Sequence, residues 1–382
     1  MARKQETYNN YPYGKSGGNK RRHSLLGTLL FIILLALSLS FSVALAIAYV
    51  TPYVSPSTFG SLTIVGIFAP ILFVCVASCM LLWIVMWRWR MALALFIVLL
   101  PGIMRFSDFY NIDVMREGEL PREKGSFTVM SYNVRSLYDD DHNTTTDSLV
   151  NYLSNNELAD IVCFQEFRRD AEGVERIDSL FNRRYKRCYV SDAVEYSNVV
   201  MRTYSCYPII AKGEMQNIYR GTSQWCDIVV GSDTMRLFNN HLYSMHISGD
   251  ESADIHSGEI LGDSDRMMSI VDRIAGNSAI RAEHVDMLRE LIDESPYKNV
   301  VLGDFNDVPM SFVYNKLIDN LVDTFVEQGS GYGYTFRPMY GMLRIDYILH
   351  SHGIKSLYYY ANENAEVSDH LPILVRLKFE DK

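Results

Sequence analysis

The stretch Val300-Val301-Leu302-Gly303-Asp304-Phe305-Asn306-Asp307 places an apolar run directly before a glycine and three polar residues. This pattern is typical of a buried strand that ends at the edge of a sheet, where α/β proteins place their sites. Residues two apart in a strand point the same way, so Asp304 and Asn306 are predicted to face one bound group. The alternative is an ordinary Gly-Asp/Asn turn at a strand end.

The charge of the 382-residue chain is uneven. The first 121 residues hold 10 Lys+Arg and 5 Asp+Glu, which leaves 26 and 40 for residues 122–382, a net charge of −14. Such an acidic region disfavours non-specific binding of nucleic acid, because that binding depends on Lys and Arg at the phosphates. It suits a divalent cation, although acidic surfaces are also ordinary in soluble domains. The six cysteines form no CxxC pair, which disfavours a zinc site, and a disulfide among Cys163, Cys188, Cys206 and Cys226 stays open.

The first third of the chain is predicted to be a membrane anchor. Residues 1–24 are polar and predict a disordered tail. Three apolar stretches follow, Leu25–Val50, Leu62–Trp87 and Met91–Met104. A spanning helix needs about 20 apolar residues, whereas the apolar core of a signal peptide has only about 7–15. We therefore expect about three transmembrane helices within residues 25–107, rather than a signal peptide or a buried helical hairpin.

The positive charges predict the orientation of this anchor. Lys and Arg precede the first stretch, Arg88 and Arg90 lie between the second and third, and the loop 51–61 has none. The positive-inside rule places the N-terminal tail in the cytoplasm and the chain after about residue 107 on the outer side. Arg105 lies on the side that this rule disfavours. Residues 108–125 are predicted to be a linker, and residues 126–382 a separate domain.

The last two-thirds of the chain has many strand-like runs and few helices. Helical spacing is found at 144–156 and at 264–294, where an interruption at Gly276-Asn277 stays open. This mixture favours stacked sheets flanked by helices. The predicted strands cover 127–133, 160–166, 198–201, 208–211, 227–230, 235–239, 299–302, 345–349 and 373–379.

Polar residues suited to metal or phosphate chemistry end several of these strands. Each also has a structural explanation, since Glu166 can pair with Arg168 or Arg169 and His241 can be a core histidine. Their joint occurrence favours one site. The residues are Asn133, Glu166, His241, Asp304, Asn306, Asp346, Asp369 and His370.

Six short motifs occur in one order: Ser131-Tyr132-Asn133-Val134, Phe164-Gln165-Glu166, Asn240-His241-Leu242, Gly303-Asp304-Phe305-Asn306, Arg344-Ile345-Asp346-Tyr347-Ile348 and Ser368-Asp369-His370-Leu371-Pro372. Over about residues 126–379 the chain thereby resembles the endonuclease/exonuclease/phosphatase superfamily, the DNase I-like metal-dependent phosphodiesterases. Its anchor is similar to that of membrane-attached bacterial members. The resemblance implies a four-layer α/β sandwich, with two mixed β-sheets face to face, helices outside and the site at one edge.

The resemblance also implies a metal. Mg²⁺ or Mn²⁺ is expected at Glu166, with Asn133 beside it and Asp369 completing or sharing the site. A hard cation prefers such oxygen ligands, often one or two carboxylates with water. It would act as a Lewis acid on a phosphate oxygen.

The implied catalytic residues surround this metal. His370 is expected to be the general base that takes a proton from the attacking water, and Asp346 to orient it. His241 and Asn306 would donate to the phosphoryl oxygens, while Asp304 would position the water or a second metal.

The function expected from the resemblance is a phosphoester hydrolase in a bacterial inner membrane, with its domain on the periplasmic side. Its substrate would be nucleic acid, for which Arg183–Arg187 offers a basic patch, or a phospholipid or inositol-phosphate head group. The alternative from another class is a non-catalytic receptor for a phosphorylated ligand. No protein partner is implied. Arg281 is expected to be a surface charge, and the aromatic loop Gly331–Phe336 could contact a base, sugar or lipid.

Overall fold

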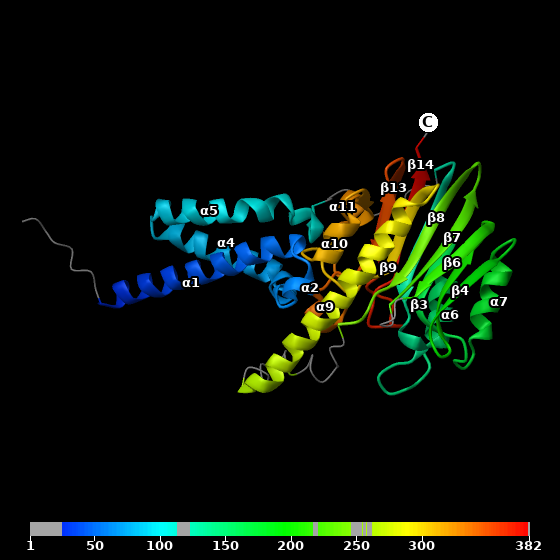
Figure 1. The fold of residues 1–382 in the computed structure, drawn as a ribbon, viewed down its shortest axis with the longest axis horizontal. Helices are drawn as coiled ribbons and strands as arrows, with labels where there is room; N and C mark the ends of the chain where they lie inside the picture. The colour runs from blue at the N-terminus through cyan, green and yellow to red at the C-terminus, as the bar shows by residue number, and fades with distance from the viewer. Residues whose placement is uncertain are drawn as a thin grey trace, which may run out of the picture.

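The computed structural model describes residues 25–112, 123–216, 221–245, 254, 257 and 262–380. The predicted disordered tail at 1–24 lies outside these residues. The helices of the first third of the chain form one end of the molecule, and the strands with their flanking helices form the other (Figure 1). We call residues 25–109 the N-terminal helical part and residues 123–380 the sheet domain.

The N-terminal helical part has a helix at each of the three apolar stretches. They are α1 (Leu25–Val50), the pair α3 (Leu62–Ile67) and α4 (Ala69–Val85), and α5 (Trp89–Met104). The second stretch is divided because Pro70 begins a new helix after Phe68. Short helices η1 (Thr51–Tyr53) and α2 (Pro56–Phe59) connect α1 to α3.

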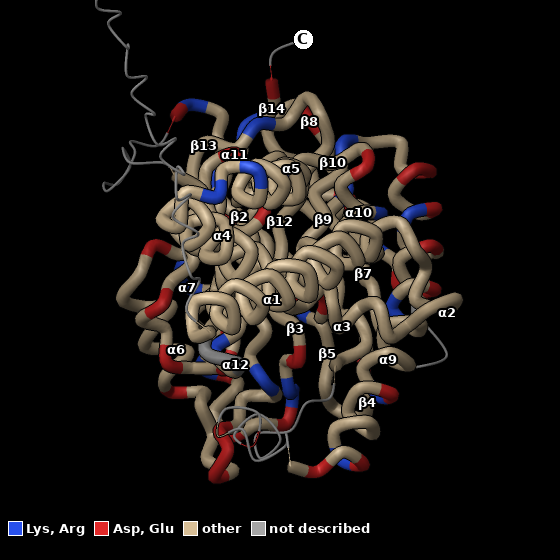
Figure 2. Tube along the Cα trace, turned by 90° about the vertical axis from the view of Figure 1, so that its left-hand side faces the viewer, with Lys and Arg blue, Asp and Glu red and all other residues tan. Residues whose placement is uncertain are grey.

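By length and composition, one stretch of the described residues, Leu25–Tyr53, could cross a membrane. Only 11% of its apolar window is buried, unlike the core helix of a soluble protein. Ala69–Val85 and Trp89–Met104 are apolar but shorter. Seen along these helices, α1, α4 and α5 are almost free of charged residues, which gather around the rim of the sheet domain (Figure 2).

Two six-stranded sheets form the centre of the sheet domain, as the sequence predicted. The first has the order β10 (Leu321–Asp323), β12 (Asp346–Ser351), β9 (Lys298–Asp304), β8 (Asp233–His241), β7 (Thr222–Val230) and β6 (Ile209–Gln216). The second has the order β13 (Ile354–Ala361), β14 (Ile373–Phe379), β2 (Ser126–Asn133), β3 (Ile161–Arg168), β5 (Val199–Ser205) and β4 (Tyr189–Tyr196). Both are mixed, because β8–β9 and β2–β3 are parallel and the other pairs antiparallel.

The sheets pack face to face through alternating apolar side chains, among them Val129, Ile161, Leu237 and Leu302. Helices α6 (Thr146–Asn155) and α7 (Glu175–Arg184) cover the outer face of the second sheet. Helices α9 (Ser264–Asp293) and α10 (Phe312–Leu317) cover the first. The predicted four-layer α/β sandwich is therefore confirmed. Minor elements are η2 (Phe106–Asp108), β1 (Tyr110–Asn111), η3 (Arg135–Leu137), α11 (Thr324–Gln328), β11 (Gly331–Tyr332) and α12 (Pro338–Gly341).

The N-terminal helical part is docked closely on the sheet domain. Ile270 and Ile274 of α9 pack against Ile64 and Ile67 of α3. A Cβ added at Gly60 would lie 2.7 Å from the carbonyl oxygen of Ala275. The predicted linker is also partly ordered, because β1 pairs with β11. Residues 113–122 of that linker are not among the described residues.

Two details differ from the sequence predictions, and a third concerns the interruption at Gly276-Asn277 that the sequence left open. Helix α9 continues through Gly276 and Asn277, because the Asn277 amide donates to the carbonyls of Ser244 and Met245 instead of breaking the helix. Arg281 is not a surface charge: it is fully buried and paired with Asp307, Nε to Oδ2 3.3 Å. Strands β4 and β13 and helix α7 were not predicted. No disulfide joins any of the six cysteines, all of which lie within the described residues.

Candidate active site

Four strands deliver polar side chains to one edge of the sandwich. Asn133 ends β2, Glu166 lies near the end of the neighbouring β3, and His241 and Asp304 face each other at the ends of β8 and β9. The Asn133 amide nitrogen donates to Glu166 Oε1 at 3.1 Å and to Asp304 Oδ2 at 3.0 Å. Asn133 therefore joins the two sheets at the site.

Glu166 is turned into this edge by an irregular backbone. Its φ is +50°, a conformation that favours glycine, and the β3–β5 register shifts between Phe164 and Phe167. Such bulges re-aim side chains beside active sites. The backbone strain is compatible with a functional position, because strained residues persist where the surroundings hold them.

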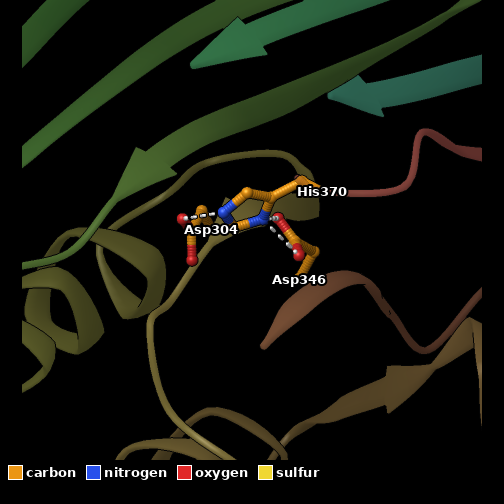
Figure 3. A group of neighbouring side chains, drawn as sticks. All are labelled: Asp304, Asp346 and His370. Atoms are coloured by element: carbon orange, nitrogen blue, oxygen red, sulfur yellow. Dashed lines mark hydrogen bonds and ion pairs between the residues drawn. The ribbon is translucent and has the colours of Figure 1, made fainter. Parts of the chain in front are cut away.

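His370, Asp346 and Asp304 form a buried row (Figure 3). His370 Nδ1 lies 2.9 Å from Asp346 Oδ2, and its Nε2 lies 3.6 Å from Asp304 Oδ2. Burial alone would lower the pKa of His370, but the charges of Asp346 and Asp304 outweigh it and raise the pKa to about 10. Phe336 packs on the imidazole with ring centroids 4.9 Å apart. The ring is thus held in one orientation.

Glu195 of β4 is a further member of the site that sequence reasoning missed. Its Oε2 lies 2.7 Å from His241 Nδ1, and its Oε1 accepts the backbone N–H of Glu166 at 3.0 Å. Burial would lower the pKa of His241, but Glu195, Glu166 and Asp304 together raise it to about 10. No motif surrounds Glu195 in the sequence, so only the pairing of β4 could have found it.

Asn306 and Asp369 occupy less central places. Asn306 lies beyond the end of β9 with φ +50°, and its side-chain amide donates to the carbonyl of Leu242 at 3.0 Å. Its backbone N–H donates to Asp304 Oδ1 at 2.8 Å. Asp369 is paired with Arg135, Oδ2 to Nε 3.7 Å. Asn306 thus lies outside β9, so strand alternation does not set its direction, and the expectation that it faces one bound group together with Asp304 stays a prediction.

Two groups of side chains could hold a metal ion. Ligand atoms of Asp304, Asp346 and His370 lie within 4.8 Å of one another, but both Asp346 oxygens already contact His370. The carboxylates of Glu166 and Asp304 lie beside His241, at 3.6 and 3.9 Å from its Nε2. Both groups offer two carboxylates, which a hard cation prefers, and one imidazole. They differ in access, because Glu166 of the second group lines an open pocket, whereas all three residues of the first group are buried.

The Glu166 side opens into a pocket of about 420 Å³ lined by Glu195, His241 and Tyr243 among others. Two carboxylates, those of Glu166 and Glu195, line this pocket. Nearby, burial and the charge of Asp346 raise the pKa of Asp304 to about 6, against the opposing charges of His370 and His241. Concentrated negative charge in a pocket is a favourable environment for a divalent cation.

Helix α9 supports the wall of this pocket. Arg281 donates from Nη1 to the carbonyl of Tyr243 at 3.0 Å, and Asn277 donates to that of Ser244 at 2.9 Å. Arg281 also binds Ser278 Oγ at 2.7 Å, so its charge and donors are satisfied within the fold. Arg281 therefore supports the segment that contains Tyr243 and Ser244, and its charge is paired with Asp307 rather than presented to the pocket.

The family model of the Endonuclease/Exonuclease/phosphatase family matches residues 130–370, which contain all of these side chains. A second family model, described as a domain of unknown function, matches residues 28–109. A comparison with curated proteins finds no match.

Solved structures similar to this chain include humanized TDP2 of D. rerio, with 14% identity, TM-score 0.48 and coverage of 66% of this chain and 99% of that chain. The human Nocturnin catalytic domain with bound sulfate has 14% identity, TM-score 0.48 and coverage of 68% and 96%. An endonuclease/exonuclease/phosphatase from Beutenbergia cavernae has 16% identity, TM-score 0.48 and coverage of 67% and 72%.

Proposed function

The chain belongs to the Endonuclease/Exonuclease/phosphatase family, and from this premise we propose that it is a divalent-metal-dependent hydrolase of phosphodiesters. The observation that supports this most is the His370–Asp346 pair at 2.9 Å, connected through Asp304 and Asn133 to Glu166. A base, its orienting carboxylate and an oxygen-rich acidic group thus meet at one sheet edge.

His370 acts as the general base in this proposal. Asp346 holds Nδ1, which leaves Nε2 to take a proton from water. The raised pKa shows that the surrounding carboxylates favour the charged imidazole. Positive charge bound at the acidic groups would lower this pKa toward the range in which a neutral imidazole accepts a proton.

The donor set of the Glu166 side fits Mg²⁺ or Mn²⁺. Glu166 would be the principal ligand. The Asn133 side chain presents its amide nitrogen to Glu166, while its oxygen accepts the backbone N–H of Arg135, so Asn133 would join the ion by turning this amide. Asp369 would join by leaving its ion pair with Arg135. The bound ion would supply Lewis-acid stabilisation of charge on the phosphate. Asp304 would position the water.

His241 would donate from Nε2 to the phosphoryl oxygens as negative charge develops there. Glu195 favours its charged form, in which both ring nitrogens are donors. Asn306 has one amide hydrogen committed to Leu242, and its second would serve as a further donor.

We also propose that α1, α4 and α5 anchor the chain in a bacterial inner membrane with the sheet domain on the periplasmic side. The outward side chains of these helices are large and apolar, such as Leu29, Val85 and Ile97. The basic residues Arg88 and Arg90 lie at the turn between α4 and α5, at the end away from the sheet domain.

The full chain in detergent, assayed with bis(4-nitrophenyl) phosphate and Mg²⁺, tests the proposed reaction. His370→Ala is expected to lower kcat by about 100- to 10,000-fold, the usual contribution of a general base. His352→Ala, at an exposed histidine between β12 and β13, is the matched control. Equal rates in the two variants contradict the proposal, and phosphate binding without turnover supports a receptor instead.

A further inference from the structure

Two adjoining apolar pockets lie where the N-terminal helical part meets the sheet domain. One has a volume of about 210 Å³ and the other about 300 Å³. Pro70, Val74 and Tyr332 line both, so the pockets share a wall. None of the described residues that line them is charged. The lining of these pockets is therefore mainly apolar and suits the hydrocarbon part of a ligand.

The wall that α4 contributes is open on its outer side. Val74 is 62% exposed and Ile71 40% exposed, on a helix whose other outward side chains are also apolar. In the membrane proposed above, this side faces lipid chains. The pockets are thus accessible from the apolar layer of the bilayer rather than only from water.

An apolar cluster connects the pockets to the catalytic histidine. Leu343 lines the larger pocket, and its carbonyl accepts the backbone N–H of Phe336 at 3.2 Å. Phe336 is the residue whose ring packs on His370. A second connection runs through Ile67, which lines the larger apolar pocket and packs against the cluster that contains Met245. Met245 directly follows Ser244, which lines the pocket beside Glu166.

We propose that these pockets take the hydrocarbon chain of a lipid phosphoester, whose phosphate then reaches the site at Glu166 and His370. The inference rests on the proposed hydrolase function and names its substrate class as an amphiphile drawn from the membrane. The aromatic loop Gly331–Phe336 would have a role here, since Tyr332 lines both pockets and Phe336 contacts the base.

A matched pair of diesters tests this. Methyl 4-nitrophenyl phosphate and hexadecyl 4-nitrophenyl phosphate have the same reacting centre and differ only in the alkyl chain. In both, water forms the new bond to phosphorus and the bond to 4-nitrophenolate breaks, so its release reports each rate. The full chain is assayed in phosphatidylcholine nanodiscs with Mg²⁺.

The informative variant is Val74→Trp, which places a larger side chain in the wall that the two pockets share and so reduces their volume. Val85→Trp is the control, because Val85 is a 74% exposed residue of the same helix that lines neither pocket. Partition into the bilayer raises the apparent rate for the hexadecyl ester in every variant. The test therefore compares the hexadecyl-to-methyl ratio of kcat/KM between Val74→Trp and Val85→Trp. We expect Val74→Trp to lower the hexadecyl-to-methyl ratio of kcat/KM by about tenfold or more, as expected from the loss of two buried methylene groups.

An unchanged ratio in Val74→Trp, with methyl ester still hydrolysed, overturns the chain-binding inference alone and leaves a pocket for structural bilayer lipid only. Absence of His370-dependent hydrolysis of either ester overturns the proposed function, and this inference falls with it. A lowered ratio in Val85→Trp as well would show a general effect of the substitution on the helix and also contradicts the assignment.

Discussion

The site contains two histidine–carboxylate pairs that are nearly alike in geometry and differ in surroundings. His370 has Asp346 at Nδ1 and His241 has Glu195, at 2.9 and 2.7 Å. Both Nε2 atoms face the same Asp304 oxygen, at 3.6 and 3.9 Å. The pKa of each is raised to about 10. Charge alone therefore does not distinguish the base from the donor.

What distinguishes them is access. His241 lies on the wall of the open pocket beside Glu166, where we propose that the phosphate and the cation bind. His370 is buried and covered by Phe336, and its Nε2 faces Asp304. The two roles that we propose, proton transfer at the covered ring and charge stabilisation at the open one, therefore rest on the difference in access and not on the carboxylate partners.

The largest expected effect on kcat distinguishes Asp346, the partner of His370, from Glu195, the partner of His241. Asp346→Asn should lower kcat by about 1,000-fold, because His370 loses both its orientation and the charge that stabilises the imidazolium. Rates are measured with bis(4-nitrophenyl) phosphate at saturating Mg²⁺. A loss smaller than that caused by Glu195→Gln would reverse the assignment of base and donor.

We expect the metal requirement to depend on Glu166, which lines the open pocket, and not on Asp346. Chelation by EDTA is expected to abolish activity, and Mg²⁺ to restore it. In Glu166→Gln the Mg²⁺ concentration for half-maximal activity should rise by about 100-fold, because a principal carboxylate ligand is lost. In Asp346→Asn it should stay close to that of the unmodified chain. The opposite order would place the ion at the Asp304–Asp346–His370 group.

Glu195→Gln is expected to have the mildest effect on the reaction, about tenfold on kcat. The amide can still accept the backbone N–H of Glu166, and His241 keeps a donor. What is lost is the charge that holds His241 in its protonated form, so transition-state stabilisation weakens without disappearing. The check is a kinetic comparison with Glu214→Gln, at an exposed glutamate of β6.

The sequence predicted most of the residues that the structure brings together, because five of them stand at or near strand ends within motifs and His370 stands in a further motif. The five are Asn133, Glu166, His241, Asp304 and Asp346. The sequence missed Glu195 because that residue lies where the β4–β5 register shifts, between Val194 and Tyr196. Glu166 lies at the corresponding shift between β3 and β5. Two irregularities flanking one strand thus aim two carboxylates at His241, and periodicity of two cannot foresee either.

The burial of Arg281 and the division between α3 and α4 show a second reason why sequence prediction failed. A lone arginine in a helix is ordinarily solvated, and its burial here follows from Asp307, a residue that only the packing of α9 brings near. The apolar run Leu62–Trp87 predicted one helix, but its division at Phe68 depends on Pro70 and on the docking of Gly66 against Met310. Tertiary contacts decide both.

The smallest expected effect concerns the buried His284, whose pKa is shifted in the direction opposite to those of His241 and His370. His284 of α9 contacts Ser223 Oγ at 2.9 Å but has no carboxylate among the described residues in contact with its ring. Burial, with the nearby His241 charge, lowers its pKa to about 4 from the ordinary 6.5. The folded state therefore resists protonation, and the unfolded state takes the proton first as pH falls below 6.5.

His284 should thus cost the full chain about 3 kcal/mol of stability as pH falls from 6.5 to 4, at about 1.4 kcal/mol per pH unit. His241 and His370 have the opposite sign: their stabilisation is complete below pH 6.5 and is lost as pH rises toward 10, so they add no slope in this window. Thermal unfolding in detergent at a series of pH values measures the sum of all titrating groups. This sum includes Asp304, whose pKa of about 6 stabilises the fold as pH falls through the same window, so the difference between variants isolates His284. His284→Gln, which cannot titrate but can still bond Ser223, should flatten the acid side relative to His352→Gln, and parallel curves for the two variants would show that the buried ring is already charged in the fold.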